Sequence, residues 1–458
     1  MPDNEKQFES DIEAFLVSAQ GGWTKATDAG YRAHAAKGLD LGTLVDFVKT
    51  TQPKAWGRFE RQCNNDAAEK FYREFDKAVQ RDGMLAVLRH GFSYRNISFR
   101  VCYFRPESSL NDEATRLYGQ NICQCVRQWH YSPGNNNSVD MMLAINGIPV
   151  VAIELKNQLT HQSVENAKKQ WMFDRDPHEI PFRLNNRVLV FFAADLYNVC
   201  MTTRLNRAKT FFLPFDQGSN GAGKDGGAGN PPSNDGNYVT SYFWRDVLQK
   251  DKLLDILQKF MNFEVREEKV RQAGGREITK TSKKLIFPRF HQMDVVRKLV
   301  ADVRERGAGH DYLIQHSAGS GKSNSIAWTA YRLASLHDDG NAPVFTSVII
   351  LTDRLILNQQ LISTITGFEH QAGLVATIGE GQTSQALKQA LQDGKRIIVC
   401  NIQKFPVIYR ELSGTEGRKF AVIVDEAHSS QSGHSAEDRK STRLNSSHTD
   451  SSRMPSSA

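Results

Sequence analysis

HSAGSGKS, residues 316–323, is the stretch of this sequence that decides the fold of its C-terminal half. The apolar segment 311–314 before it predicts a short strand, and residues from about 322 to 335 predict a helix. A glycine-rich loop between a strand and a helix is the phosphate-loop pattern G-x-x-x-x-G-K-[ST], in which His316 here replaces the first glycine. A solvated surface turn is the alternative interpretation, but the strand–loop–helix context favours a loop that binds phosphates.

The loop supplies the groups that phosphate binding needs. Gly319 and Gly321 allow backbone N–H groups to turn toward phosphate oxygens, and the N-terminus of the following helix adds the positive end of its dipole. Lys322 would bring a positive charge to the terminal phosphates. Ser323 would offer its hydroxyl to Mg²⁺. We therefore expect ATP and Mg²⁺ as ligands of this loop.

Short apolar runs follow the loop, separated by longer segments that can form helices. This alternation is typical of a parallel sheet whose strands are joined by crossover helices. Residues 285–435 are therefore expected to form a RecA-like parallel α/β lobe. The runs are residues 347–351, 396–400 and 420–424.

Two carboxylates follow the last of these runs, Asp425 and Glu426. The carboxyl end of a strand is where an α/β sheet builds its site. We expect Asp425 to hold Mg²⁺ through water and Glu426 to orient or deprotonate the attacking water. An acidic strand end on a plain surface is the alternative, and the phosphate loop about 100 residues earlier weakens it.

These segments and their order resemble superfamily 2 helicases. The resemblance implies that Thr352, Arg354 and Gln403 contact the backbone of DNA. Such contacts follow the phosphates without reading the base sequence. It also matches FPRFHQ, residues 287–292, to the glutamine motif of those proteins. The amide of Gln292 is then expected to pair with the donor and acceptor edges of adenine.

A second constellation lies in the N-terminal half, in the segment 139–156 (VDMMLAINGIPVVAIELK). The Asn-Gly pair between two apolar runs predicts a hairpin. Asp140 would lie on its first strand, and Glu154 and Lys156 share one face of the second. Charged groups at the end of a buried strand need a reason. Two carboxylates can bind Mg²⁺, and a lysine can stabilise an incoming hydroxide; a strand-end ion pair is the alternative.

The register of this hairpin decides whether the two carboxylates can meet. An ideal two-residue turn at 146–147 places Asp140 opposite Ile153, which sends Asp140 and Glu154 to opposite faces. A longer connection with a bulge, and Gly147 in the left-handed region, places Asp140 opposite Glu154. A shared metal site requires something like the second arrangement.

The whole pattern resembles the restriction subunits of type I restriction–modification systems, in which a nuclease domain precedes a helicase motor. Their nuclease motif, Asp…Glu-x-Lys on a restriction-endonuclease-like fold, is followed by a helix with Gln-x-x-x-Tyr. Residues 163–173 predict that helix, with Gln170 in place and Asp174 where the tyrosine would be. The resemblance covers residues from about 5 to 435. The matching segments are IELKNQLT, VENAKKQW, FPRFHQMDVVRKL, HSAGSGKSNSIAW, TDRLILNQQ, NIQKF and VDEAHSSQSG.

The resemblance implies an enzyme, a type I site-specific deoxyribonuclease in which ATP-dependent DNA translocation is coupled to Mg²⁺-dependent double-strand cleavage. It implies catalytic roles for Asp140, Glu154, Lys156 and Gln170, with Asp140 and Glu154 as metal ligands. It also implies partners, namely double-stranded DNA and the methyltransferase and specificity subunits. The role of Asp174 stays open.

The fold class expected is α/β, with a mixed-sheet nuclease domain followed by the P-loop lobe. A Gly- and Asn-rich segment between them is either a linker or a surface insertion, because nothing in it can be ordered by burial. Residues 5–20 predict an amphipathic helix and 187–194 a buried strand. The expected divisions are 1–215 (nuclease domain), 216–237 (Gly-rich segment), 238–284 (connecting segment), 285–435 (first motor lobe) and 436–458 (tail).

The tail differs in style from the rest of the chain. It is rich in serine, lacks hydrophobic periodicity and follows the DEAH segment directly. We expect it to be disordered and foreign to the fold, and the motor to be truncated after this segment, without the second lobe that closes on ATP.

Composition is compatible with these interpretations. The net charge is +7 and the pI about 9.0, which favours a polyanionic partner. No run of about 20 apolar residues could span a bilayer, so we expect a cytoplasmic protein. Two alternatives stay open: a helicase-like repair or remodelling ATPase whose N-terminal domain only binds DNA, and an inert fragment.

Overall fold

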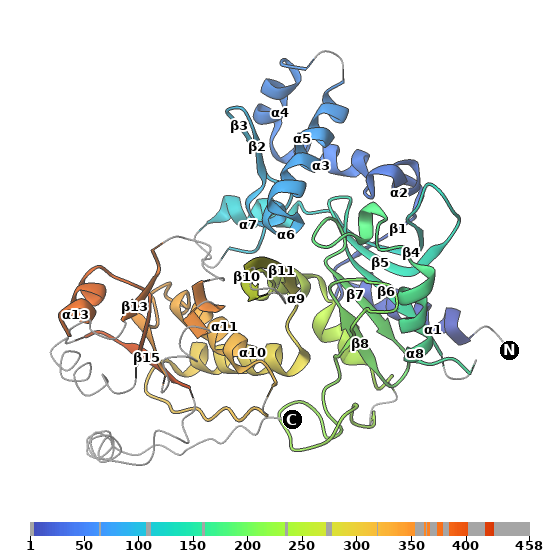
Figure 1. The fold of residues 1–458 in the computed structure, drawn as a ribbon. Coiled ribbons are helices and arrows are strands. Elements are labelled where there is room, and N and C mark those ends of the chain that lie inside the picture. The colour runs from blue at the N-terminus through green and yellow to red at the C-terminus, as the bar shows by residue number, and fades with distance from the viewer. Residues whose placement is uncertain are drawn as a thin grey trace. The chain divides into compact units, whose positions relative to one another are not determined.

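The computed structural model of the chain forms two compact units, and each is described by itself (Figure 1). Unit 1 comprises Met1–Ser219 and Ala228–Arg289, and unit 2 comprises Asn220–Gly227 and Phe290–Ala458. The structure describes residues 4–63, 66–106, 111–157, 161–233, 237–271, 277–317, 319–352, 361–362, 364–366, 373–378, 384–401 and 417–425.

Unit 1 is built on a mixed sheet of seven strands in the order β1-β4-β5-β6-β7-β8-β9. The pairs β1–β4 and β6–β7 are parallel, and the other neighbouring pairs are antiparallel. The predicted mixed sheet is thereby confirmed. Its strands are β1 (Thr24–Ala26), β4 (Cys123–His130), β5 (Ser138–Ile145), β6 (Ile148–Leu155), β7 (Val190–Ala194), β8 (Val199–Thr202) and β9 (Leu213–Pro214).

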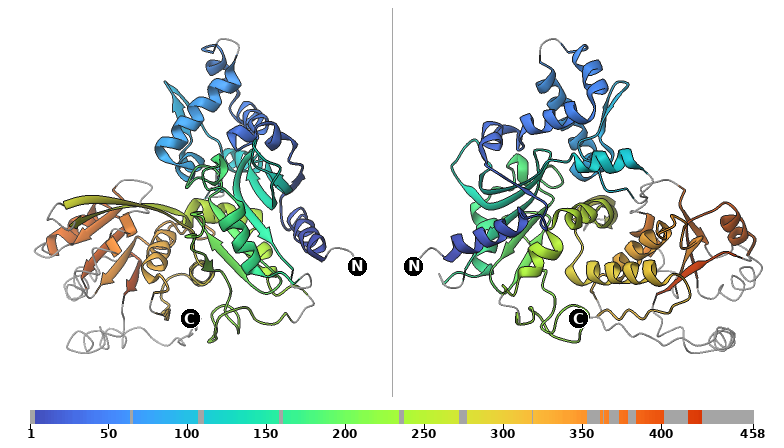
Figure 2. Two further views of the ribbon diagram at one scale, coloured as in Figure 1. Left: turned by 45° about the vertical axis from the view of Figure 1, so that its right-hand side comes forward. Right: turned by 180° about the vertical axis from the view of Figure 1, so that it is seen from behind.

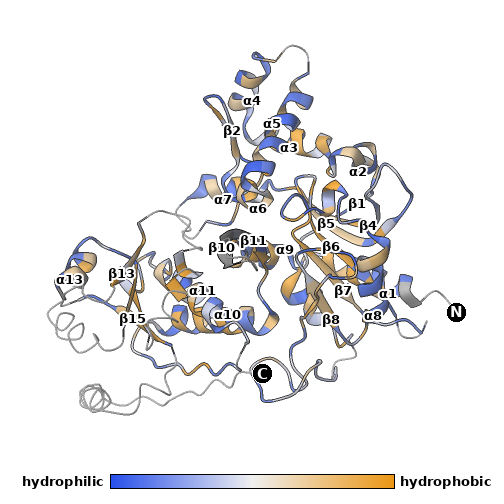
Figure 3. Ribbon diagram, in the orientation of Figure 1, coloured by the Kyte–Doolittle hydropathy of each residue, from blue (hydrophilic) through white to orange (hydrophobic). Residues whose placement is uncertain are grey.

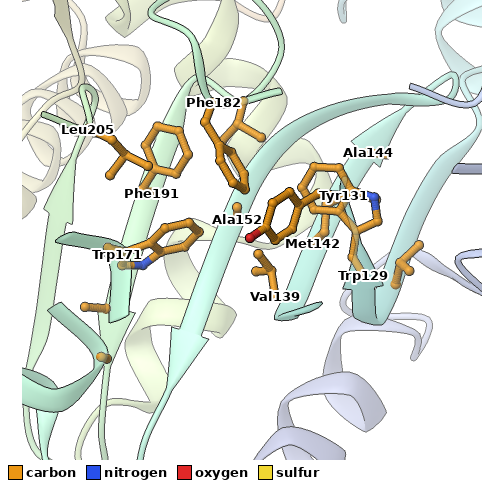
Figure 4. Close-up of a cluster of buried hydrophobic side chains, with 14 of the residues drawn as sticks. Trp129, Tyr131, Val139, Met142, Ala144, Ala152, Trp171, Phe182, Phe191 and Leu205 are labelled. Carbon is orange, nitrogen blue, oxygen red and sulfur yellow. The ribbon is translucent and has the colours of Figure 1, made fainter. Parts of the chain in front are cut away.

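The central strands β5, β6 and β7 form the core of this unit and are coloured hydrophobic in Figure 3. Every residue of β6 and β7 is buried, which is why these segments read as continuous apolar runs and not as alternating ones. Aromatic side chains pack over one face of the sheet, with Trp171 and Phe182 meeting Phe191 (Figure 4). Aromatic pairs of this kind add packing energy beyond the area that they bury.

The remaining elements of unit 1 surround that sheet. A helical part with a short hairpin stands apart from the sheet in all three ribbon views (Figure 2), and its core is a cluster of phenylalanines from α4, α5, β2 and β3. The elements are α1 (Asn4–Leu16), α2 (Ala29–Ala33), α3 (Leu41–Thr51), α4 (Pro53–Glu60), α5 (Ala67–Asp82), α6 (Met84–His90), β2 (Phe92–Tyr94), β3 (Ile97–Phe99), α7 (Asp112–Gly119), α8 (Val164–Lys169), α9 (Lys250–Asp255), β10 (Asn262–Arg271) and β11 (Glu277–Ile286).

Two elements are shorter than the sequence predicted. The helix expected at 5–20 ends at Leu16, because the backbone turns at the Gly21–Gly22 pair and Trp23 N donates to Leu16 O (3.0 Å). The strand expected at 187–194 begins at Val190. Arg187 instead directs its guanidinium to Asp76 (2.8 Å), in a fully buried position.

The Gly-rich segment closes on itself. Gly218 N donates to Gly229 O and Gln217 N donates to the Asn230 side chain, both at 2.8 Å. Its ends therefore meet, as they do in a surface insertion and not in an extended spacer. The segment expected to connect the domains packs within unit 1, where Trp23 Nε1 donates to Leu248 O at 2.8 Å.

Unit 2 contains the parallel sheet that the apolar runs predicted, in the order β13-β14-β12-β15. Helix α11 begins at the phosphate loop and packs against β12, β14 and β15. The RecA-like fold class of this unit is confirmed. The elements are α10 (Phe290–Arg306), α11 (Lys322–Ala334), β12 (Ser347–Thr352), β13 (Val375–Ile378), α13 (Ser384–Gln392), β14 (Ile397–Asn401) and β15 (Phe420–Val424).

The strand expected at 311–314 is wrong. These residues are extended but pair with no strand among the described residues, and Leu313 and Ile314 are exposed. A strand is stable only when a neighbour takes its backbone hydrogen bonds. Within the described sheet, β15 is an edge strand and bonds only to β12.

Candidate functional site

The β5–β6 hairpin brings the first candidate residues together. Its turn has two residues, Asn146 (φ 52°) and Gly147 (φ 79°), the left-handed pair that Asn-Gly favours. Ile145 faces Ile148, but the register shifts between Leu143 and Ala144, so that Met141 faces Ile153. Continued by one residue, this register sets Asp140 opposite Glu154.

The bulge is not where the sequence placed it. We expected it at Gly147, but the register skips Val150, since Ala144 faces Pro149 and Leu143 faces Val151. The turn itself is pinned too tightly to be widened: Asp40 N donates to Gly147 O (2.8 Å), and a Cβ on Gly147 would lie 2.3 Å from Asp40 O. The extra residue therefore appears further along the strand.

Asp140 is buried and held by the second strand. Its Oδ2 accepts a hydrogen bond from Leu155 N at 2.7 Å, and Lys156 Nζ lies 3.6 Å from the same oxygen. The lysine also donates to Leu155 O at 2.8 Å. A carboxylate and an ammonium group are thus fixed side by side at the carboxyl end of β6.

Glu154 is fully buried, and its two oxygens differ. Oε1 lies 2.7 Å from Arg175 Nη2 and also accepts a hydrogen bond from Arg175 Nε (2.9 Å). Oε2 is buried and accepts no hydrogen bond from the described residues. Burial raises the pKa of Glu154 well above its usual range, the charge of Asp140 raises it further, and Arg175 opposes both.

An unsatisfied buried carboxylate oxygen beside a second carboxylate fits a cation. Buried polar atoms are normally hydrogen-bonded, so we expect Glu154 Oε2 to bind a group that the described residues do not supply. Among the described residues, no group of three or more His, Cys, Asp or Glu side chains could hold a metal ion. Mg²⁺ does not need such a group, since it usually binds through one or two carboxylates and keeps several waters. Asp140 and Glu154 could hold one Mg²⁺ in this way.

Arg175 is the residue of this site that the sequence analysis missed. Its guanidinium is almost fully buried, donates to Ser138 O (2.6 Å) as well as to Glu154, and lies over the Tyr131 ring, 5.6 Å from its centroid. It reaches the site because residues Gln170–Asp174 form a π-helical turn. In such a turn the residue five positions after Gln170 takes the place that the fourth has in an α-helix.

The residues at the two ends of the Gln-x-x-x-Tyr motif, Gln170 and Asp174, do not contact Asp140 or Glu154 in any hydrogen bond or ion pair among the described residues. Gln170 is half-buried and its side chain makes no hydrogen bond with the described residues, and Asp174 is exposed. The helix is instead anchored by Trp171, whose Nε1 donates to Phe192 O at 2.9 Å. A catalytic role for Gln170 stays a prediction.

A third buried carboxylate, Glu9, comes from α1. Burial raises its pKa, as does the charge of Asp140. Glu9 is committed to Arg127, whose Nη2 donates to it at 2.8 Å, and to Gln128. It therefore adds to the negative field around Asp140 without being an open ligand.

The second candidate site is the phosphate loop of unit 2. Gly319 and Gly321 have φ values of 75° and 86°, which L-residues rarely adopt, and α11 begins directly at Lys322. A Cβ on Gly319 would meet nothing within 4 Å, so this glycine borders open space. Ser323 is half-buried in the first turn of the helix, and Ala318 lies outside the described residues.

Gln292 contacts the loop itself. Its Nε2 donates to Ser320 O (3.1 Å) and Gly321 O (3.0 Å), and a Cβ on Gly321 would lie 2.4 Å from this nitrogen. The glutamine therefore helps to set the loop conformation, and the positive φ of residue 321 favours a glycine there. Its expected contact with adenine stays a prediction.

His316 stands where the loop pattern has its first glycine. Burial, followed by the charges of His291 and Lys322, lowers the pKa of this histidine to about 4. The two histidine rings meet edge to face, with 5.3 Å between their centroids. His316 is therefore neutral near pH 7 and brings no additional positive charge to the loop.

The strand ends of unit 2 meet at one edge, because the sheet is parallel. Thr352 ends β12 and is buried, and Asp425 follows β15, with its N–H donating to Leu351 O at 2.9 Å. Asp425 is half-buried. The other expected residues, Arg354, Gln403 and Glu426, lie outside the described residues.

Fold and sites together define the class of protein: an α/β chain with a paired-carboxylate site on a mixed sheet, followed by a RecA-like phosphate-loop lobe. Residues 40–210 match the family described as type I restriction enzyme R protein N terminus. Residues 291–448 match the SWI2/SNF2 ATPase family, and this match extends past residue 435, where we expected the lobe to end. The two matches together support a type I restriction R subunit with a helicase-like ATPase region. No curated protein matches the sequence. Among the described residues, no helix is long and apolar enough to cross a membrane.

Proposed function

We propose that this chain cuts double-stranded DNA in a Mg²⁺-dependent reaction coupled to ATP-driven translocation, as a type I site-specific deoxyribonuclease. The observation that carries the proposal is the pairing of Asp140 with Glu154, whose Oε2 is buried and accepts no hydrogen bond from the described residues. The pair lies inside the segment that matches the R protein N terminus. A structural ion pair would satisfy its oxygens internally; this one leaves an oxygen for a ligand.

In the nuclease site, Asp140 and Glu154 would hold Mg²⁺. The ion would polarise the scissile phosphate and lower the pKa of a bound water. Lys156, whose Nζ lies 3.6 Å from Asp140, would stabilise the incoming hydroxide and the charge that develops on the phosphate. Arg175 would orient Glu154 by holding Oε1, which leaves Oε2 to the metal.

In the phosphate loop, Lys322 would contact the terminal phosphates of ATP, and Ser323 and Asp425 would hold the Mg²⁺ of the nucleotide. Glu426 would orient the attacking water. Thr352, Arg354 and Gln403 would contact the DNA backbone during translocation. These roles place energy use and DNA tracking in unit 2 and cleavage in unit 1.

The partners proposed are double-stranded DNA and the methyltransferase and specificity subunits of the same system. Recognition of a target sequence would then lie in the specificity subunit. The proposed location of this assembly is the cytoplasm.

The test is plasmid cleavage by the chain assembled with its methyltransferase and specificity subunits. Lys156→Ala should abolish Mg²⁺-dependent nicking and linearisation while binding of ATP persists. Lys169→Ala is the matched control, because Lys169 is an exposed lysine at the end of α8. Cleavage that survives in Lys156→Ala would reject the nuclease and favour a remodelling ATPase whose N-terminal domain only binds DNA.

A further inference from the structure

The segment after β8, residues 204–211, is an irregular loop with a fixed conformation. Leu205 is buried in the aromatic cluster beside Phe191 (Figure 4). Thr210 is also buried: its hydroxyl donates to Arg207 O (2.7 Å) and accepts from Asn206 N (2.8 Å). The loop is therefore anchored at both ends and cross-linked by its own side chains.

What this rigid loop presents to solvent is unusual. Phe211 is 74% exposed, although its neighbours Thr210 and Phe212 are both packed against the protein. Arg204 and Lys209 are exposed as well, and neither forms an ion pair with the described residues. Exposing a large aromatic side chain on an ordered backbone, between unpaired cations, gives no stability to the folded chain.

The loop is linked to the nuclease site through neighbouring residues. Arg207 Nη2 forms an ion pair with Asp176 at 3.1 Å. The residue before Asp176 is Arg175, which holds Glu154. A second exposed aromatic, Phe173 at 62%, belongs to the π-helical turn of that same segment. An ion pair between exposed side chains thus joins the loop to the segment that supplies Arg175.

We propose that residues 204–211 bind a locally unpaired strand of DNA, with Phe211 stacked on a base and Arg204 and Lys209 on phosphates. The proposal rests on the proposed function in that DNA is the substrate. Cations that follow a backbone, together with an aromatic face for the bases, are the two features of single-strand binding. An intact duplex hides the faces of its bases, so a rigid exposed phenyl ring fits an unpaired strand better than a paired one.

The test is binding of a short fluorescein-labelled oligothymidine to the full chain, followed by anisotropy in EDTA. Phe211→Ala should weaken binding roughly 5-fold to 100-fold, the worth of one stacked base. Phe211→Trp should restore it. Tyr197→Ala is the control, because Tyr197 is also exposed (54%) but lies at the other end of β8.

The remaining arms separate charge from stacking. Lys209→Ala and Arg204→Ala should each reduce the salt dependence of oligothymidine binding by roughly 0.7 in the log–log slope. Phe211→Ala should leave that slope and the affinity for a duplex of equal length unchanged. Oligothymidine affinity within twofold of the parent in Phe211→Ala, or an equal loss for duplex, would overturn the proposal. Because no metal is present, this failure is distinct from loss of the nuclease in Lys156→Ala.

Discussion

The two candidate sites are built in opposite ways, one from buried ionisable side chains and the other from backbone groups. At the β5–β6 hairpin, ionisable groups are buried and fixed: Glu154 is fully buried between Asp140 and Arg175. At the phosphate loop, the site is formed by the backbone. Gly319 borders open space, and Gln292 contacts Gly321. The carboxylate site is therefore formed at an electrostatic cost within the folded chain, whereas the phosphate loop buries no such unpaired carboxylate among the described residues.

Removing one cationic side chain from each site tests this comparison. Arg175→Met leaves the carboxylate of Glu154 buried without its counter-charge, which should lower the free energy of unfolding by about 3–5 kcal/mol. Urea denaturation of the chain would measure it. Adding Glu154→Gln should recover much of the loss. Arg183→Ala is the control, because Arg183 is an exposed arginine whose side chain donates to His178 O. A loss below about 1 kcal/mol in Arg175→Met, the range of a surface pair, would mean that burial does not fix Glu154 as described.

The equivalent change in unit 2 should leave stability alone. Lys322→Ala should weaken ATP binding by about 1.5–3 kcal/mol, the worth of a hydrogen bond to a charged group, with little change in the unfolding midpoint. Calorimetric titration with ATP would measure it. Lys298→Ala is the control, because Lys298 lies on α10 and pairs with Asp294 (2.8 Å). Unchanged ATP affinity in Lys322→Ala would remove the nucleotide site from this loop.

The smallest expected effect is a difference in pH dependence. The folded chain keeps a proton on Glu154 after the unfolded chain has lost it, because burial and Asp140 raise this pKa. Stability should therefore fall as pH rises above about 4.3, by at most about 1.4 kcal/mol per pH unit. Comparing unfolding of the parent and Glu154→Gln in EDTA would isolate this contribution from other groups.

Magnesium should reverse the sign of this dependence. Binding to ionised Glu154 stabilises the folded chain more as the proton is lost, so the parent should gain stability from Mg²⁺ toward higher pH. Glu154→Gln should gain much less. Identical pH profiles for the two proteins, with and without Mg²⁺, would show that Glu154 does not carry the raised pKa.

The sequence was sufficient for the elements that local patterns determine. The Asn-Gly turn and its flanking apolar runs predicted the β5–β6 hairpin, and the apolar runs after the phosphate loop predicted β12, β14 and β15. The bulge was expected at the wrong residue, although Pro149 carried a signal. Proline donates no hydrogen bond and is confined within sheets to edges and bulges, and β6 lies in the middle of its sheet.

Other features depend on contacts that no local pattern reports. The segment 311–314 is as apolar as a strand, but strand formation depends on a neighbour. Arg175 could not be predicted from spacing, because its place follows from a π-helical turn and from the buried partner Glu154. The exposure of Phe211 could not be predicted from the sequence either, since hydrophobic residues are normally expected inside.

The π-helical turn at Gln170–Asp174 also changes how this chain should be aligned with others. A motif such as Gln-x-x-x-Tyr, with a fixed number of residues between its two ends, assumes that those residues form a regular α-helix. Here one additional residue is accommodated within the turn, so that the partner of Glu154 is separated from Gln170 by four residues and not three. Asp174, which stands where the motif has its tyrosine, lies within this turn, and Arg175 is the residue that holds Glu154.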